Sequence, residues 1–109
     1  MDDSTEGLEG MLAKSLEGKY VLRLYISGKT PRSEHAVVNI KKLCETYLKG
    51  RHELTVVDLY QVPEEATDQQ IIVTPTLIKS LPPPLRRLIG DLSNRNRVLL
   101  ALDLEPEEQ

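Results

Sequence analysis

"VTPTLIKSLPPPLRRLIGD", residues 73–91, is the stretch that decides the fold. It sets a Thr-Pro pair before one apolar run, three consecutive prolines after that run, and then a basic apolar run that ends in Gly-Asp. Short aliphatic runs bounded by proline and glycine are typical of strands joined by a stiff turn. We therefore predict two short strands, over TPTLIK and RRLIGDL, joined by SLPPP.

The chain before this segment predicts a strand, a helix and a second strand. Tyr20–Ser27 is apolar apart from Arg23, which is typical of a central strand. Ser33 is the candidate N-cap of a helix that ends at Gly50 and carries one apolar stripe: Ala36, Val37, Ile40, Leu43, Cys44, Tyr47 and Leu48. Glu53–Tyr60 is rich in β-branched residues and predicts a second strand. A strand, helix and strand of these lengths imply a parallel, right-handed crossover.

Two further helices complete the predicted order. Pro63 stands at the first helical position of a short helix, with Glu64 and Glu65 in the first turn, where carboxylates suit the helix dipole. Ser93 is the candidate cap of a last helix whose inward residues are Val98, Leu99, Leu102 and Ala101. The predicted fold class is α/β with the order βαβαββα, which resembles a thioredoxin-like domain.

Length and composition indicate one globular domain with an aliphatic core. The 109 residues include no Trp or Phe and 39% hydrophobic residues. We expect the domain to span residues 19–104, with an acidic flexible tail at 1–18 and a frayed acidic tail at 105–109. The net charge of −3 argues against nucleic acid as a partner, because phosphate binding needs a basic excess.

The chain shows no targeting or membrane signal. Its first residues are acidic where a signal peptide would be basic, and no apolar run approaches the ~18 residues that cross a bilayer. A single cysteine excludes an intramolecular disulfide and fits a reducing compartment. We therefore expect a cytoplasmic protein without stable membrane insertion.

No constellation of residues indicates catalysis, a cofactor or a metal. The loop after the first strand, residues 27–35, contains no cysteine, and Cys44 lies on the inward stripe of the first helix. His35 and His52 have no ligand partners at metal spacing. Asp58, at a strand end, is expected to bond to loop amides. These absences favour a binding module over an enzyme.

Three strings carry a resemblance to a known family: YVLRLYISGKTPRS, TVVDLYQVPEEA and IIVTPTLIKSLPPPLRRLIGDLSNRNRVLLALDL. They closely resemble the KaiB family of circadian clock proteins, from about Tyr20 to Leu104. The resemblance implies a non-enzymatic partner that binds the N-terminal ATPase ring of the ring ATPase KaiC and recruits KaiA or output kinases. A related domain begins a clock-output sensor histidine kinase.

The resemblance also implies a chain with two architectures. One is a thioredoxin-like monomer that binds KaiC, and the other is a ground state, usually tetrameric, with the order βαββααβ. Residues up to about Tyr60 are common to both. Pro75 in VTPTL resembles the cis-proline of thioredoxin-like folds. The positions expected to take part in the fold switch or in this cis-proline turn are Pro75, Pro82, Pro83, Pro84, Gly90, Ala101 and Asp103. The alternative is that these prolines stiffen a single fold.

Residue 101 indicates which architecture dominates. Family members often carry Gly at the position matched by Ala101, in a segment that is helix only in the thioredoxin-like state. Ala is better than Gly in a helix by about 1 kcal/mol, or about fivefold in a balanced equilibrium. We therefore expect the thioredoxin-like monomer as the main form, with a homotetramer as the ground-state alternative.

The resemblance and the topology suggest where partners dock. We expect KaiC at the second helix and the following loop, comprising Glu64, Glu65, Asp68, Gln69, Ile72, Val73, Thr74 and Thr76. The edge of the second strand, including Thr55 and Val57, is a candidate for strand addition by a second partner. Residues 79–97 hold five bases, including Lys79, Arg86 and Arg87, against one acid, and form either a docking face or ordinary solvated surface.

A second function stays open at this point. A thioredoxin-fold module without redox chemistry, serving stress or signalling partners outside a clock, has the same sequence features, because rhythm belongs to an assembled system.

Overall fold

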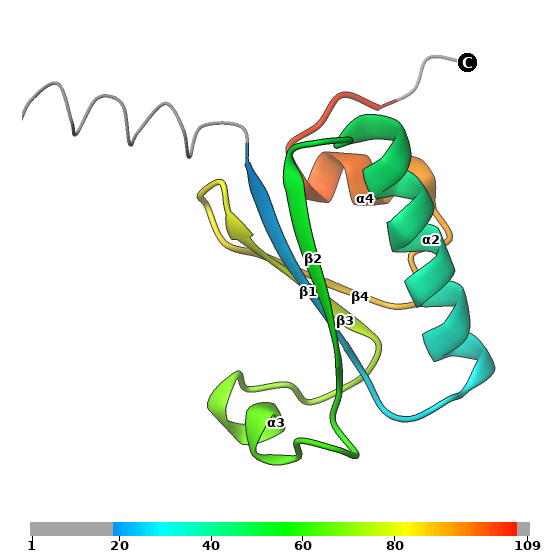
Figure 1. Cartoon of the computed structure of the whole chain (residues 1–109), viewed down its shortest axis with the longest axis vertical. Coiled ribbons are helices and arrows are strands. Elements are labelled where there is room, and N and C mark those ends of the chain that lie inside the picture. Colours follow the sequence, from blue (N-terminus) through cyan, green and yellow to red (C-terminus); the bar gives the residue numbers. More distant parts are fainter. Residues whose placement is uncertain (1–18, 107–109) are drawn as a thin grey trace, which may run out of the picture.

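The computed structural model describes residues 19–106 and has the predicted order βαβαββα (Figure 1). Its elements are β1 (Tyr20–Ile26), α2 (Pro31–Tyr47), β2 (His52–Asp58), α3 (Glu64–Asp68), β3 (Thr76–Leu81), β4 (Arg86–Ile89) and α4 (Arg95–Ala101). The tail predicted at residues 1–18 lies outside the described residues, as do residues 107–109 of the predicted C-terminal tail.

The four strands form one sheet in the order β2-β1-β3-β4. β1 pairs in parallel with β2, from Tyr20 opposite His52 to Ile26 opposite Asp58, which confirms the predicted parallel crossover. β3 runs antiparallel to β1, and β4 runs antiparallel to β3. The prediction of a central first strand is confirmed, and β2 and β4 are the edges.

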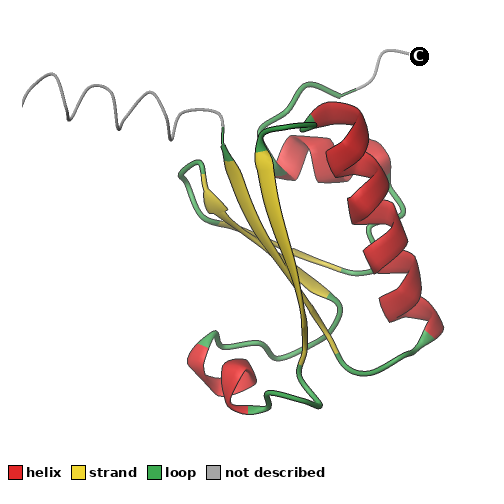
Figure 2. Cartoon of the chain, in the orientation of Figure 1, coloured by secondary structure: helices red, strands yellow, loops and turns green. Residues whose placement is uncertain are grey.

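The helices divide between the two faces of the sheet (Figure 2). On one face, α2 and α4 pack with Leu22, Leu24 and Leu77 into the main core. On the other, α3 rests on a smaller cluster of Tyr25, Leu59 and Ile78. Because side chains alternate along a strand, β1 supplies both clusters. The small cluster leaves most of α3 open to solvent.

Two helix caps differ from the prediction. Thr30, not Ser33, caps α2, because Thr30 Oγ1 accepts a hydrogen bond from the Ser33 amide at 3.1 Å. Pro31 opens the helix, where its fixed φ and missing N–H carry no penalty, so Ser33 is buried inside the first turn. Asn94, not Ser93, caps α4 by accepting from the Arg97 amide at 3.1 Å.

Candidate partner-binding site

α3 and the loop that follows it form the most exposed part of the predicted docking region. None of the helix's residues is buried, and Glu64 and Asp68 face solvent. Glu65 is half-buried, and its Oε2 accepts a hydrogen bond from the Tyr25 hydroxyl at 3.4 Å. Ala66 packs against the Tyr25 cluster. The helix therefore turns Glu64 and Asp68 outward, while Glu65 and Ala66 contact the Tyr25 cluster.

The loop after α3 presents apolar side chains to water. Ile72 is 96% exposed and Val73 is 44% exposed. Ile89, across β3–β4 from Thr76, is 52% exposed and continues the apolar surface. We call Ile72, Val73 and Ile89 the apolar patch. An apolar patch with an acidic helix beside it is a surface that a protein partner can bury.

The remaining predicted loop residues hold the loop in place. The Thr74–Pro75 peptide bond is cis, as VTPTL suggested, and so are Leu81–Pro82 and Pro83–Pro84. Thr74 Oγ1 donates to Ser27 Oγ at 2.9 Å, and the Gly90 amide donates to the Pro75 carbonyl at 3.0 Å. Thr76 is buried and donates to the Val73 carbonyl. Thr74 and Thr76 therefore hold the loop in position, and Thr76, unlike the half-buried Thr74, is not exposed to a partner.

The bases of the C-terminal half are mostly engaged within the protein. Arg87 donates through Nη2 to the Gln69 carbonyl at 2.6 Å and through Nη1 to the Gln70 carbonyl at 3.3 Å. Arg87 thus ties β4 to the end of α3. Arg86 Nη2 lies 3.4 Å from Asp103 Oδ1. Both side chains nevertheless remain exposed, so a partner can still contact them.

Lys79 does not belong to a surface patch. Its side chain is fully buried, and Nζ lies 2.7 Å from Asp103 Oδ2. Lys79 hydrogen-bonding, followed by the Lys79 and Arg86 charges, holds the pKa of Asp103 below its usual value. Counting Lys79 among surface bases was therefore wrong. The alternation of β3 carried the signal, since Lys79 is two residues from the core residue Leu77 and shares its face.

The edge of β2 is open along the predicted strand-addition site. Thr55 and Val56 are exposed, and Val57 is half-buried against the Tyr25 cluster. Only β1 pairs with β2 within residues 19–106. One side of the β2 backbone therefore remains unpaired there, which is the requirement for strand addition.

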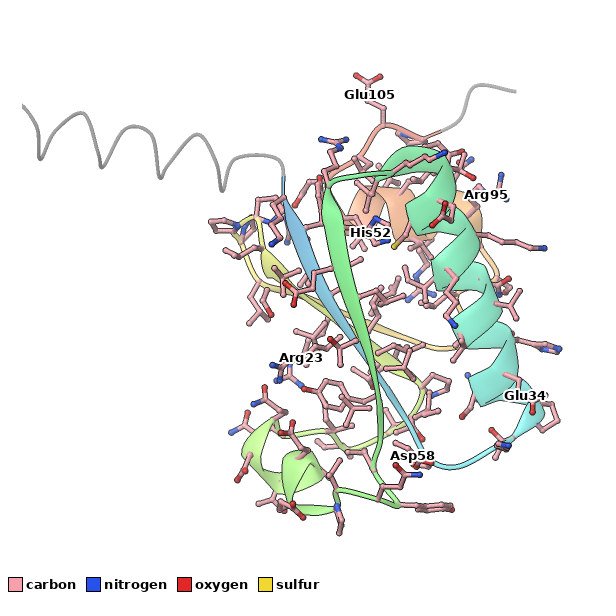
Figure 3. All side chains as sticks on the ribbon, viewed as in Figure 1. Arg23, Glu34, His52, Asp58, Arg95 and Glu105 are labelled. Atoms are coloured by element: carbon pink, nitrogen blue, oxygen red, sulfur yellow. The ribbon has the colours of Figure 1, made fainter. Side chains whose placement is uncertain are left out.

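The loop between β1 and α2 forms a tight turn and contains no cysteine. Asp58 Oδ1 accepts from the Gly28 amide at 3.0 Å and from the Tyr60 amide at 2.9 Å, which confirms the predicted role of Asp58 (Figure 3). Gly28 has φ +69°, and a Cβ there would lie 2.7 Å from the Tyr60 ring. Only glycine fits this position without rearrangement.

The single thiol is unsuited to nucleophilic chemistry. Cys44 is buried in the main core, and burial raises the pKa of its thiol to about 11. Across residues 19–106, no three His, Cys, Asp or Glu side chains gather as a metal site would require. None of the helices in that range is long and apolar enough to cross a bilayer.

Known proteins share both the sequence and the fold. The KaiB domain model matches residues 23–104. The circadian clock oscillator protein KaiB of a Picosynechococcus species is 50% identical over 93 residues, which are 85% of this chain and 89% of that protein.

Solved structures agree with this assignment. The N-terminal domain of Synechococcus elongatus SasA superposes with a TM-score of 0.64 at 25% identity, covering 78% of this chain and 84% of the other. Oxidised mitochondrial thioredoxin 3 of Saccharomyces cerevisiae gives a TM-score of 0.64 at 14% identity, covering 89% and 90%, and shares the fold alone. The fold is therefore thioredoxin-like, and the chain belongs to the KaiB family of circadian clock proteins.

Proposed function

We propose that this chain is a non-enzymatic regulator that binds the N-terminal ATPase ring of a KaiC-type ATPase through α3 and the apolar patch. The observation that carries this proposal is the exposure of Ile72, at 96%, beside a half-exposed Val73. Exposure of apolar side chains to water is unfavourable, so a partner that covers this surface lowers the free energy of the complex.

The rigidity of the loop supports docking at this place. Hydrogen bonds hold the segment from the end of α3 to Pro75 at three points. They run from Thr74 to Ser27, from Gly90 to Pro75 and from Arg87 to the end of α3. A surface that is ordered before binding loses less conformational entropy when the partner arrives. The acidic residues Glu64 and Asp68 beside the patch favour a partner surface with basic groups.

The open edge of β2 supports a second partner. We propose that KaiA or an output kinase adds a strand along Thr55–Asp58 once the ATPase is bound. α3 lies at the Asp58 end of β2 (Figure 1), and Val57 packs on the same cluster as Ala66 of α3, so a strand added along Thr55–Asp58 would lie close to a partner bound at α3. The chain would then act as an adaptor between an ATPase and an output protein.

We propose further that the thioredoxin-like arrangement is the binding-competent form of a chain able to adopt a second fold. α3 and the loop after it are the parts of the surface that depend on the order βαβαββα. Ala101 stands in the last turn of α4, where Ala supports the helix better than Gly.

Binding to a purified KaiC-type ATPase and to its isolated N-terminal ring tests the function. The wild-type chain is expected to co-elute with the ring in gel filtration, and Ile72→Arg is expected to weaken binding by at least about tenfold, because a charge replaces a buried apolar anchor. Leu100→Arg is the matched control, since Leu100 is 59% exposed on α4.

Two results would contradict the proposal at different levels. A wild-type chain that binds neither the ring nor the whole ATPase would reject the function and favour a redox-inactive thioredoxin-fold module in another signalling system. Equal loss of binding in Ile72→Arg and Leu100→Arg would keep the partner but reject the apolar patch as its site.

A further inference from the structure

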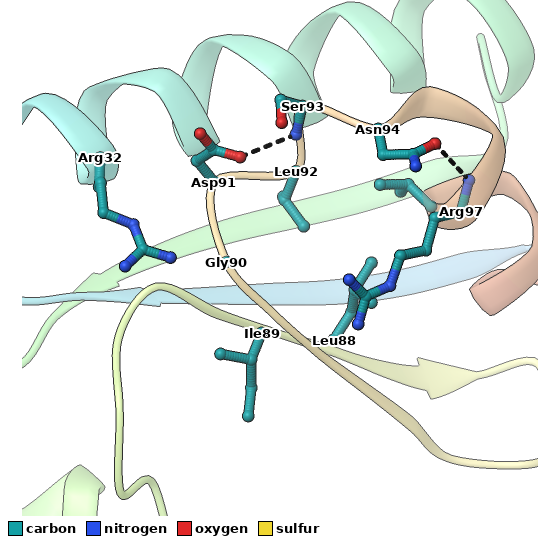
Figure 4. Close-up of a pocket in the computed structure, with 10 residues that line it drawn as sticks. Arg32, Leu88, Ile89, Gly90, Asp91, Leu92, Ser93, Asn94 and Arg97 are labelled. Carbon is teal, nitrogen blue, oxygen red and sulfur yellow. Dashed lines mark hydrogen bonds between the residues drawn. The ribbon is translucent and has the colours of Figure 1, made fainter.

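A cavity of about 360 Å³ lies between the start of α2 and the β4–α4 connection, and Ile89 of the apolar patch is among the residues that line it (Figure 4). Leu88, Leu92 and Val98 line it from the core and are each less than 9% exposed. Arg32 enters from the first turn of α2 and Arg97 from the first turn of α4. The cavity therefore combines an apolar floor with two guanidinium groups at its rim.

Arg32 and Arg97 differ from several other bases within residues 19–106, whose side chains have partners inside the protein. Lys79, Arg86 and Arg87 pair with Asp103 or with the carbonyls after α3, and Arg51 lies over the Tyr20 ring. In contrast, neither the Arg32 nor the Arg97 guanidinium donates a hydrogen bond to any residue between 19 and 106. Unpaired guanidinium groups thus gather at this cavity.

The one carboxylate in the cavity lining does not neutralise both arginines. Asp91 Oδ1 accepts from the Ser93 amide at 3.1 Å. Hydrogen bonds from Ser93 are the main cause that lowers the pKa of Asp91, and the charge of Arg32 contributes less. Two positive charges therefore face one negative charge that is already hydrogen-bonded to its own loop, and the cavity keeps an excess of positive charge.

The backbone shape supports an open site between the two arginines. Gly90 has φ +121°, and a Cβ added there would lie 3.8 Å from Arg32 Nη2. Figure 4 shows the two guanidinium groups on either side of the Gly90 segment. The Gly90 amide donates to the Pro75 carbonyl at 3.0 Å, which holds the connection against the segment before β3.

We propose that this cavity binds a small organic oxyanion, held by Arg32 and Arg97, with its apolar part resting on Leu88, Leu92 and Val98. Guanidinium groups match carboxylate and phosphate oxygens in a bidentate geometry. The volume is near the lower end of the roughly 300–1,000 Å³ typical of small-ligand pockets, which suits a compact molecule. The site adjoins the apolar patch at Ile89, but the proposal does not require the ATPase partner.

Titration of the isotope-labelled full chain, followed by amide NMR, tests the proposal. The probes are phenyl phosphate and benzoate as oxyanions with an apolar ring, inorganic phosphate as an anion alone, and phenol as the ring alone. We expect saturable shifts of the Gly90, Asp91 and Leu92 amides with phenyl phosphate or benzoate. Phenyl phosphate against benzoate decides between phosphate and carboxylate, and inorganic phosphate and phenol should bind at least about fivefold more weakly than the better of the two.

Arginine variants separate a built site from general charge attraction. Arg97→Gln and Arg32→Gln are each expected to weaken binding about tenfold, the effect of losing a charge-assisted hydrogen bond. Arg95→Gln removes the same charge from the same helical turn and should change binding less than twofold. Unfolding curves of all three variants check that the fold is retained.

The proposal is overturned by any of three results. They are an absence of saturable shifts with all four probes, equal weakening by Arg95→Gln and Arg97→Gln, and shifts that centre on residues 64–76 instead of the Gly90–Asn94 connection. The first result would leave the ATPase proposal untouched, because that rests on α3, Ile72 and Val73, none of which lines the cavity.

Discussion

The ion pair between Lys79 and Asp103 links two elements of the C-terminal half. Lys79 is a fully buried cation whose Nζ lies 2.7 Å from Asp103, and Asp103 stands just after α4 with φ +60°. A buried ammonium group is stable only when it is paired. Asp103 therefore joins the end of α4 to β3 in the arrangement βαβαββα.

Substitutions at this ion pair are expected to be unequal. Asp103→Asn leaves the Lys79 charge buried with a weaker partner and should lower the midpoint of thermal unfolding. Lys79→Met replaces the charge with an apolar chain of similar length and should change the midpoint less, because burying methionine carries no ionic desolvation cost. Calorimetry of both variants measures this. An equal or larger loss in Lys79→Met would contradict the role assigned to the pair.

The same carboxylate predicts a dependence of stability on pH. The Asp103 pKa is lower in the folded chain than the usual value for aspartate, about 3.9, so its contribution to stability is complete above that value. The contribution is lost as pH falls through the folded pKa. Urea unfolding at pH 6 and pH 3 should show a smaller acid loss in Asp103→Asn than in wild type. An unchanged acid loss in Asp103→Asn would contradict the assignment.

Ala101 is expected to favour one of the two proposed architectures, because its segment is a helix only in the thioredoxin-like one. Ala101→Gly should disfavour α4 by about 1 kcal/mol, and so shift a balanced equilibrium about fivefold towards the alternative fold. Two sets of amide resonances with changed relative intensity would report the shift. Loss of stability with a single set of resonances would mean that Ala101 supports one fold only.

Among the elements, α3 is the least supported by apolar packing. No residue of α3 is buried, and its end is held by Arg87 from β4. The order of elements was predictable because strand and helix periodicities are local properties of the sequence. The bonds from Arg87 to Gln69 and Gln70 were not, because they join an arginine to carbonyls 17 and 18 residues away, and sequence patterns do not record such pairs.

Removal of the Arg87 contacts should loosen α3 alone. Arg87→Gln is expected to raise the hydrogen-exchange rates of the Gln69 and Ile71 amides about fivefold, the effect of losing exposed charge-assisted bonds. Arg86→Gln is the matched control, because Arg86 faces Asp103 instead. Equal effects of the two variants on α3 would show that Arg87 does not anchor the helix.

Local caps show the limit of the same reasoning. Thr30 and Asn94 cap their helices where Ser33 and Ser93 were predicted, since neighbouring polar residues are equally acceptable caps by type. At the start of α2, Pro31 occupies the first helical position and so makes Thr30 the cap. At the start of α4, Ser93 is engaged by Asp91, which the sequence alone does not reveal.

At the scale of the whole molecule, the fold was predictable and the role of each surface residue was not. The apolar run of Tyr20–Ser27 identified a central β1, and the strand and helix patterns gave the order of the elements. Of the residues predicted to meet a partner, Ile72 and Val73 lie in the open, whereas Thr76 is buried and Lys79 was misplaced at the surface. Exposure depends on which elements cover each other, and this is a property of the assembled fold.

The mass of the free chain tests which architecture dominates. We expect sedimentation equilibrium at micromolar concentration to give one chain of 12.3 kDa, because Ala101 and the paired Asp103 favour the thioredoxin-like form. A species of four chains under these conditions would contradict this prediction and favour the ground-state architecture.

Hydrogen exchange of the chain, alone and bound to the N-terminal ring of a KaiC-type ATPase, tests the central claim most directly. That claim is that the chain acts by presenting α3 and the apolar patch to the ATPase. We predict that the ring slows exchange over Glu64–Thr76 and around Ile89, while the exposed side of α2 near Val38 keeps its rate. Slowed exchange at α2, with residues 64–76 unchanged, would contradict the account.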